Sequence, residues 1–128
     1  KKLEAFCKND SKRYKVVKNL GVLKYLSAMS HVDLIIGNSS SGIIESASFE
    51  KPVVNIGDRQ SGRLKGVNVI DSKIKDLSKS IKLALSKNFI HKCRGVQNIY
   101  GNGEASINIV NELINQPLSA KKFFIDIK

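Results

Sequence analysis

The chain has 128 residues, the length of one globular domain, with 41% hydrophobic and 26% charged residues, as is typical of soluble folded proteins. No apolar stretch is long enough to cross a bilayer, and no basic-then-apolar leader opens the chain. We therefore expect a cytoplasmic protein with no membrane partner. Cys7 and Cys93 lack metal-ligand spacing, so we expect two reduced thiols and neither a metal nor another cofactor.

The net charge of +11 is high for this length. Such an excess can attract a polyanion such as a nucleic acid. Only four of the 22 basic residues are arginines, the lysines are scattered, and no aromatic residues interleave with them to stack on bases. We therefore expect solvated lysines rather than nucleic-acid binding. A non-catalytic module that binds phosphate or nucleic acid stays as an alternative.

Hydrophobic periodicity predicts helices that alternate with short strands. Strands are predicted at 13–17, 32–37, 53–57 and 67–70. Helices are predicted at 2–8, 23–30, 41–49, 74–85 and 104–115. The apolar residues predicted to face inward include Ile43, Ile44, Ala47, Phe49, Ile74, Leu77, Ile81 and Leu85. Residues 88–103 are predicted to be loop, and 121–128 either pack on a neighbouring element or are partly mobile.

This alternation predicts an α/β fold, a Rossmann-like parallel sheet with helices on both faces. In open α/β sheets, ligands bind beyond the carboxyl ends of the strands. That rule points to the turns 38–45 and 57–63, which leave two apolar strands. The chain starts in a predicted helix, whereas a doubly wound domain normally starts with a strand, so we expect an N-terminal truncation.

The first turn, "GNSSSG", has the composition of an anion-binding turn. Its small residues let a phosphate approach, its hydroxyls add donors, and the start of the following helix carries partial positive charge. Ser39 or Ser40 can serve as helix cap and as phosphate donor. Glu45 lies one to two turns into the helix, where a carboxylate can accept two hydrogen bonds from a ribose diol. The alternative is that the serines only cap a helix.

Two other strand–turn–helix motifs fit this turn poorly. A P-loop requires Lys followed by Ser or Thr after its second glycine, but Gly42 is followed by Ile43. A nucleophile elbow requires Gly-x-Ser-x-Gly, and Gly37 lies one residue too far from Gly42. Neither a P-loop nucleotidase nor a serine hydrolase is therefore favoured.

The second turn, "GDRQSGR", places Arg59 and Arg63 in a loop bracketed by glycines. Guanidinium groups bind phosphate oxygens through paired hydrogen bonds. Taken alone, both arginines could equally be solvated loop cations. Together, two anion-favouring turns at neighbouring strand ends indicate a phosphate site.

The stretch "GNSSSGIIESASFEKPVVNIGDRQSGR", with "YGNGEAS" further on, resembles the C-terminal domain of hydrolysing UDP-N-acetylglucosamine 2-epimerases of the sialic-acid pathway. The resemblance covers roughly residues 17–104. Non-hydrolysing epimerases share the fold but carry Asp-Ser-Gly-Gly and Thr-Glu-Arg-Pro-Glu sequences, which are absent here. The resemblance implies that residues 1–128 form the C-terminal UDP-binding domain of a two-domain enzyme, one half of a glycosyltransferase-B-type fold.

The resemblance also assigns roles by position. Ser39 and Ser40 would bind the diphosphate of UDP, Glu45 the ribose hydroxyls and Arg59 the phosphates. The loop at Leu20 would receive the uracil, largely through backbone groups. Further candidates for UDP binding, without a firm role, are Asn19, Ser41, Gly42, Gln60 and Arg63.

The family's reaction eliminates UDP across the C1–C2 bond and hydrates the resulting glycal, so that UDP-N-acetylglucosamine and water give N-acetylmannosamine and UDP. Its catalytic acids and bases have no counterpart here, and neither His31 nor His91 stands at a matching position. We therefore expect the catalytic residues in a missing N-terminal domain, and this chain alone to be inactive and to bind UDP weakly.

Two properties stay open in this comparison. The substrate is expected to be a UDP-amino sugar, and a UDP-diacetamido-trideoxyhexose of the diacetylbacillosamine type is the alternative to UDP-N-acetylglucosamine. Because members of the family commonly self-associate, the resemblance also allows a homo-oligomer.

Overall fold

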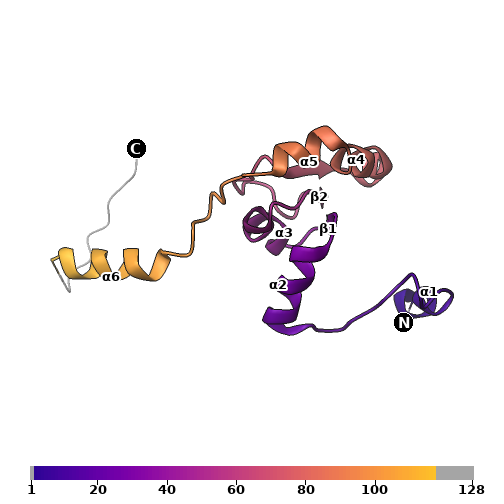
Figure 1. Cartoon of the computed structure of the whole chain (residues 1–128), viewed down its shortest axis with the longest axis horizontal. Coiled ribbons are helices and arrows are strands. Elements are labelled where there is room, and N and C mark those ends of the chain that lie inside the picture. The colour runs from indigo at the N-terminus through magenta and orange to yellow at the C-terminus, as the bar shows by residue number, and fades with distance from the viewer. Residues whose placement is uncertain (1, 118–128) are drawn as a thin grey trace.

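The structure is a computed structural model that describes residues 2–117, with a three-stranded parallel sheet at its centre (Figure 1). The strands are β1 (Ile35–Gly37), β2 (Val53–Ile56) and β3 (Val69–Ser72), in the order β1-β2-β3. Both pairs are parallel, so the carboxyl ends of all three strands lie at one edge of the sheet. The turns that follow β1 and β2, predicted to bind a ligand, therefore lie side by side at this edge.

Helices surround the sheet or stand apart from it. The α-helices are α1 (Lys2–Lys8), α2 (Gly21–His31), α3 (Ser41–Ile44), α4 (Leu77–Ala84), α5 (Lys87–Cys93) and α6 (Ala105–Asn115), and the 3-10 helices are η1 (Ser46–Phe49) and η2 (Ile74–Asp76). Four predicted helices, at 2–8, 23–30, 41–49 and 104–115, are confirmed, the third as α3 continued by η1. Figure 1 shows α1 and α6 standing away from the sheet. No helix within residues 2–117 combines the length and apolarity needed to span a bilayer.

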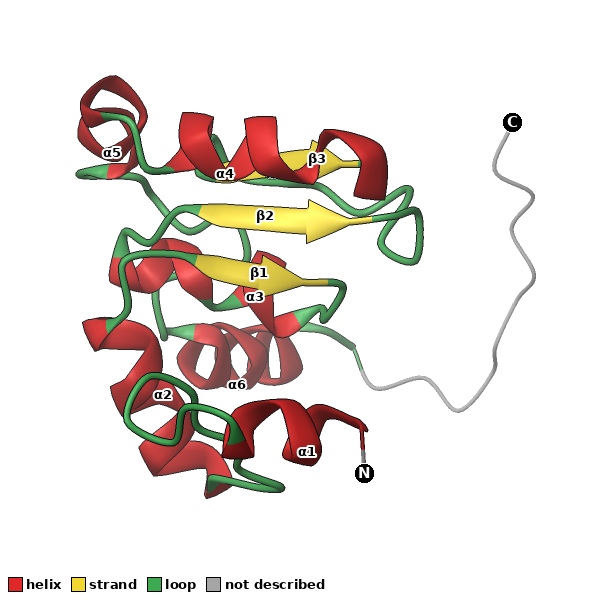
Figure 2. Cartoon of the chain, turned by 90° about the vertical axis from the view of Figure 1, so that its right-hand side faces the viewer, coloured by secondary structure: helices red, strands yellow, loops and turns green. Residues whose placement is uncertain are grey.

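Helices cover both faces of the sheet (Figure 2). A Cβ atom on Gly42 of α3 would be 3.4 Å from Cγ1 of Val53, so α3 lies on the face to which Val53 points. Successive strand residues point to opposite faces, so Ile56 and its register partner Ser72 point to the other face. There, Oγ of Ser80 in α4 donates to Oγ of Ser72 at 2.9 Å. The predicted Rossmann-like arrangement is confirmed.

The core is made of apolar residues from the sheet and from the helices on both faces: Met29, Ile43, Ala47, Val53, Val54, Ala84 and Cys93. Ile43 and Ala47 were both predicted to face inward, and they are 1% and 2% exposed. Both cysteines are free thiols. Burial raises the pKa of the Cys93 thiol, and the nearby charge of Lys92, which lowers this pKa, does not offset the increase.

The strand predicted at 13–17 is wrong, because residues 14–17 have no regular secondary structure. Within residues 2–117 the sheet has three strands, and this segment pairs with none of them. An isolated strand would leave its backbone N–H and C=O groups without partners. The apolar residues of this segment are therefore not enough to form a strand here.

The loop predicted at 88–103 is also partly wrong, because its first residues belong to α5. Ser86 is the N-cap residue of this helix, and its Oγ accepts a hydrogen bond from the backbone N–H of Phe89 at 3.3 Å. A serine ahead of a short apolar stretch was a readable helix start. From Arg94 to Gly103, the rest of the predicted loop has no helix or strand.

Three predictions of inward-facing residues or segment boundaries also need correction. Ile74 is 80% exposed, because it lies in η2, whose turn of three residues shifts it off the apolar face of α4. Leu85, at the end of α4, is 44% exposed. The strand predicted at 67–70 lies two residues later, since Val67 and Asn68 form a turn. The segment 121–128 lies outside the described residues.

Asn68 connects the start of β3 to the back of α3. Its side-chain amide donates to Oγ of Ser46 at 2.9 Å and to the backbone carbonyl of Lys51 at 2.8 Å. The Ser46 hydroxyl in turn donates to the carbonyl of Gly42 at 2.6 Å. Asn68 and Ser46 are fully buried, so these bonds hold α3 and η1 against the sheet from below the serine turn.

We expect Asn68→Ala to lower the free energy of unfolding by about 1–3 kcal/mol, because two buried groups lose their donor. Urea denaturation followed by circular dichroism measures the change. Asn88→Ala, at an exposed position in α5, is the matched control and should change stability by less than about 0.5 kcal/mol. Equal stability of the two variants would show that the Asn68 bonds contribute nothing.

Candidate functional site

The serine turn joins β1 to α3 through Asn38, Ser39 and Ser40. Ser40 stands at the N-cap position of α3, but its hydroxyl makes no capping hydrogen bond. The hydroxyl of Ser39 accepts from the backbone N–H of Ser41 at a long 3.4 Å. Helix capping therefore accounts poorly for this run of serines. Because α3 has only four residues, its dipole adds less positive charge than the sequence suggested.

The turn after β2 is fastened to the serine turn by two hydrogen bonds to one atom. The carbonyl oxygen of Asn38 accepts from Nη1 of Arg59 at 3.1 Å and from Nε2 of Gln60 at 2.8 Å. The guanidinium of Arg59 therefore contacts the backbone of the serine turn. This contact confirms that the two predicted turns come together at the carboxyl edge of the sheet.

The residues of this second turn differ in how well they could contact a ligand. Arg59 is exposed, and a guanidinium has five N–H groups, so most of its donors can face a ligand. Gln60 is only 3% exposed, so its amide acts on the turn rather than on a bound molecule. Arg63 is exposed, and its backbone N–H closes the loop on the Gln60 carbonyl at 3.4 Å.

Glu45 lies at the C-terminal end of α3, half-buried, with its carboxylate held by a neighbouring hydroxyl. Oγ of Ser41 donates to Oε2 of Glu45. The same Ser41 oxygen lies 2.6 Å from the hydroxyl of Tyr25 in α2. The acidic residue predicted to bind a diol is therefore in contact, through Ser41, with a different helix.

The loop ahead of α2 borders a cavity of about 590 Å³, lined by Val17, Lys18, Asn19, Leu20, Gly21, Val22 and Tyr25. Oδ1 of Asn19 accepts from the backbone N–H of Gly21 at 2.8 Å, at a residue whose φ of +69° suits glycine. Tyr25 both lines this cavity and contacts Ser41. It links the predicted base loop, Asn19–Leu20, to Glu45.

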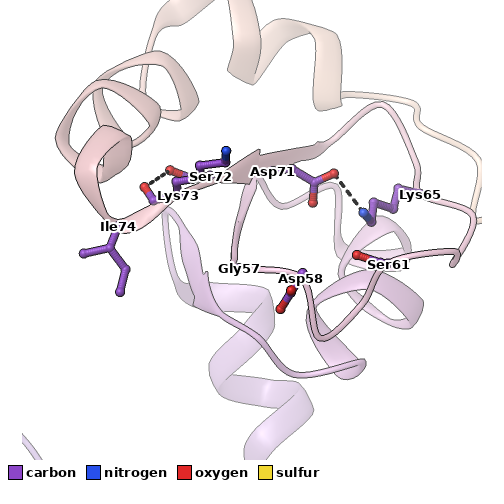
Figure 3. A pocket seen from close by; sticks show the side chains of 8 residues that line it. All are labelled: Gly57, Asp58, Ser61, Lys65, Asp71, Ser72, Lys73 and Ile74. Carbon is purple, nitrogen blue, oxygen red and sulfur yellow. Dashed lines mark hydrogen bonds and ion pairs between the residues drawn. The ribbon is translucent and has the colours of Figure 1, made fainter.

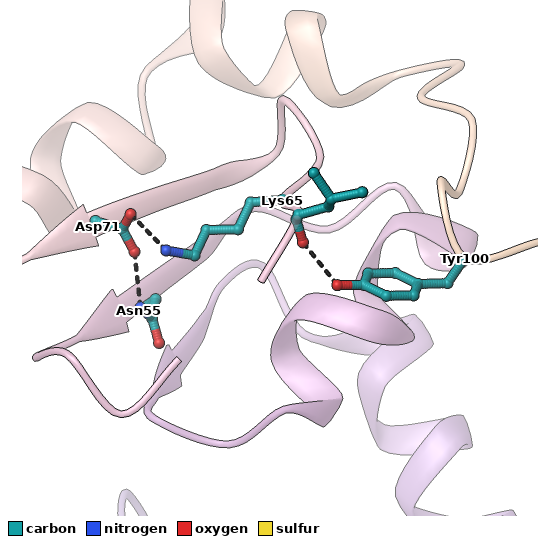
Figure 4. Close-up of polar contacts among 5 residues, drawn as sticks. Asn55, Lys65, Asp71 and Tyr100 are labelled. Carbon is teal, nitrogen blue, oxygen red and sulfur yellow. Dashed lines mark hydrogen bonds and ion pairs between the residues drawn. The ribbon is translucent and has the colours of Figure 1, made fainter. Parts of the chain in front are cut away.

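A second cavity of about 580 Å³ opens beyond the ends of β2 and β3, lined by Gly57, Asp58, Ser61, Lys65, Asp71, Ser72, Lys73 and Ile74 (Figure 3). At its wall, Nζ of Lys65 lies 2.8 Å from Oδ2 of Asp71, and Nδ2 of Asn55 donates to Oδ1 of Asp71 at 2.7 Å (Figure 4). Burial raises the pKa of Asp71, but its bonds to Lys65 and Asn55 outweigh that effect and hold the pKa below its usual value.

Tyr100 contacts the chain directly after the second turn, residues 57–63. Its hydroxyl donates to the backbone carbonyl of Leu64 at 2.8 Å (Figure 4). Nearby, Nδ2 of Asn98 donates to the carbonyl of Ile44 at 2.7 Å, at the end of α3. Asn98 and Tyr100 therefore hold the chain at the end of α3 and just after the second turn. Within residues 2–117, no group of three His, Cys, Asp or Glu residues could hold a metal ion.

Comparison with known proteins identifies the family. The sequence model of the family described as UDP-N-acetylglucosamine 2-epimerase matches residues 1–114. The chain belongs to this family. The family resemblance drawn from "GNSSSG" and "GDRQSGR" is therefore confirmed.

We compared the sequence of this epimerase-family chain with three relatives. It is 49% identical over 87 residues to a GDP/UDP-N,N'-diacetylbacillosamine 2-epimerase (hydrolysing) of Campylobacter jejuni, covering 68% of this chain and 23% of the relative. It is 35% identical to a UDP-N,N'-diacetylbacillosamine 2-epimerase (hydrolysing) of Legionella pneumophila, covering 84% and 28%. It is 33% identical to polysialic acid biosynthesis protein P7 of Escherichia coli, covering 99% and 33%. The chain thus spans between 23% and 33% of these relatives' length.

The structure places the predicted site residues in three groups. Arg59 contacts the carbonyl of Asn38, which Ser39 and Ser40 follow in the turn; Ser41 contacts Glu45; and Asn19 and Leu20 border the α2 cavity. Gly42 is buried against the sheet, where it permits the close approach of α3 rather than contact with a ligand. Tyr25 and Asn38 were missed, because a tyrosine on an apolar helix and a backbone carbonyl give no sequence signal.

The Asp71 carboxylate should make stability depend on pH. A pKa lowered in the folded state stabilises the fold above the unfolded-state value, about 3.9, and this contribution is lost as the pH falls through the folded-state value. Asp71→Asn should therefore cost up to about 1 kcal/mol at pH 7, a small figure because the side chain is 56% exposed. The difference from wild type should shrink towards zero near pH 2.

Urea denaturation at the two pH values measures this effect. Asp33→Asn, at an exposed position outside the cluster, is the control and should show no such convergence. If Asp71→Asn is less stable than wild type by the same amount at low pH, the ion pair with Lys65 is not the cause of the stability loss.

Proposed function

We propose that this chain binds the UDP portion of a nucleotide sugar, as the C-terminal nucleotide-binding domain of a two-domain hydrolysing 2-epimerase. The observation that supports it most is the convergence on Asn38. Arg59 and Gln60 both donate to its carbonyl, so a cation contacts the backbone of the serine turn at the carboxyl edge of the sheet. A diphosphate needs this combination of a cation and several small donors.

The proposed contacts follow the order of groups in UDP. The hydroxyls of Ser39 and Ser40 and the free N–H groups of Arg59 would bind the diphosphate. Glu45, whose carboxylate stands at the other end of α3, would accept hydrogen bonds from the ribose hydroxyls. The loop at Asn19 and Leu20 would receive the uracil, in the cavity that Tyr25 shares.

The same contacts would assist the reaction. In the proposed elimination a base removes the proton from C2 while the C1–O bond breaks, and the electron pair leaves with UDP. Negative charge then grows on the diphosphate, where Arg59 and the serine hydroxyls can stabilise it. Water then adds across the new double bond to give the free 2-epimeric amino sugar. We assign the groups that move protons to the other domain.

The comparisons support two sugars unequally. The relatives at 49% and 35% identity are both named for diacetylbacillosamine, so we place a UDP-diacetamido-trideoxyhexose first. UDP-N-acetylglucosamine, which the sequence pattern favoured, is the second candidate, supported by the description of the family. In the two-domain protein, release of UDP from each nucleotide sugar tests this order. A higher kcat/KM for UDP-N-acetylglucosamine would reverse it.

Calorimetric titration of the chain with UDP tests the binding site. We expect saturable binding that Ser40→Ala weakens about fivefold and Glu45→Ala about tenfold or more, as for neutral and charged hydrogen bonds respectively. Arg59→Ala should weaken the binding of UDP and leave the weaker binding of uridine unchanged. Ser78→Ala, at an exposed position on α4, is the control.

Two results would contradict the proposal, provided that a thermal melt shows each protein folded. One is a folded chain with no affinity for millimolar UDP. The other is binding of UDP no tighter than that of inorganic phosphate with a steep loss in salt, which would favour a basic phosphate- or nucleic-acid-binding module.

A further inference from the structure

The three serines of the turn have different hydrogen-bonding roles. Ser41 donates its hydroxyl proton to Oε2 of Glu45. A serine hydroxyl has only one proton, so it cannot also donate to Tyr25. The 2.6 Å contact between Tyr25 and Ser41 must therefore run from the tyrosine O–H to the serine oxygen. The result is a directed chain of hydrogen bonds from Tyr25 through Ser41 to Glu45.

This direction removes Ser41 from the set of phosphate donors. Its one proton is engaged by a carboxylate, whereas Ser39 and Ser40 stand ahead of α3. It also fixes Glu45. A glutamate side chain loses considerable rotamer freedom when it is ordered, and a bond on Oε2 selects one orientation while Oε1 stays available for a ligand. Successive bonds that point the same way strengthen one another.

The donor at the start of this chain comes from a separate element. Tyr25 belongs to α2, which begins at Gly21, directly after the Asn19–Leu20 loop. Its side chain lines the cavity at that loop and is 36% exposed. The position of α2 therefore determines both the shape of the cavity and the orientation of the Glu45 carboxylate.

We propose that Tyr25 is a positioning residue that sets selectivity for a ribose diol, by holding Glu45 through Ser41. This inference rests on the proposed function, because it assumes that Glu45 faces the ribose of a bound nucleoside diphosphate. Tyr25 does not itself contact the diol hydroxyls. Its hydroxyl prepares the carboxylate in the ligand-free protein, and such preorganisation increases affinity by lowering the ordering cost of binding.

The test compares UDP with 2′-deoxy-UDP on the full chain. Wild type should bind UDP about tenfold more tightly, the effect of one hydrogen bond to a charged group. Tyr25→Phe keeps the ring and removes only the donor. We expect it to reduce this preference to about threefold or less, and to leave the affinity for 2′-deoxy-UDP unchanged within a factor of about two.

Ser41→Ala is the second variant, and it should reduce the preference to the same extent. The double variant should lose no more than either single one, because both substitutions break the same chain. Tyr14→Phe is the matched control, since Tyr14 lies in the N-terminal segment with its ring 5.0 Å from that of Phe6. It should preserve the full preference for UDP.

The outcomes separate this inference from the proposed function. A wild-type chain that is folded but does not bind UDP overturns both. A wild-type chain that prefers UDP, with the preference unchanged in Tyr25→Phe and Ser41→Ala, overturns the role of Tyr25 and leaves the proposed function standing. An equal loss of affinity for both nucleotides would show a structural role only, and would also overturn it.

Discussion

The carbonyl oxygen of Asn38 is the atom on which the geometry of the site depends. It accepts from Arg59 and from Gln60, and these two residues lie on the turn after the neighbouring strand. Parallel pairing brings the ends of β1 and β2 to one edge, but it does not fix how the turns beyond them lie. The two donors supply that constraint. Because Gln60 is buried, it holds the turns together, and the exposed Arg59 carries the charge toward solvent.

A second set of contacts holds α3 from behind. Gly42 lets this helix approach Val53 closely, Asn68 and Ser46 form a buried hydrogen-bond path to the Gly42 carbonyl, and Asn98 donates to the Ile44 carbonyl. A helix of four residues has little stability of its own. Its orientation is therefore imposed by the sheet and by these amides, and the positions of Ser39, Ser40 and Glu45 follow from it. The polar residues around α3 thus act as a scaffold for the turn.

Much of this arrangement was predictable from local patterns, and the failures have physical causes. The parallel sheet, the helices on both faces and the two turns follow from apolar runs that alternate with amphipathic segments, because that order allows few topologies. Residues 14–17 carry a strand pattern but lack a partner among the three described strands, and pairing is not encoded in the segment itself. Tyr25 is a similar case. Its place on an apolar helix face predicts packing, whereas its hydroxyl bond to Ser41 depends on how α2 meets α3.

The proposed nucleotide site differs from a P-loop, because no lysine follows its second glycine. In that motif one mobile lysine supplies the charge and a long helix supplies the dipole. Here α3 is too short to supply much dipole, and the cation comes from Arg59 on the next turn, held in place by the Asn38 carbonyl. A guanidinium fixed in this way gives directed donors rather than a point charge. In the proposed site the three hydroxyls have different roles, since Ser41 donates to Glu45 while Ser39 and Ser40 are assigned to the diphosphate. A run of identical residues therefore acquires distinct roles from the elements that meet it.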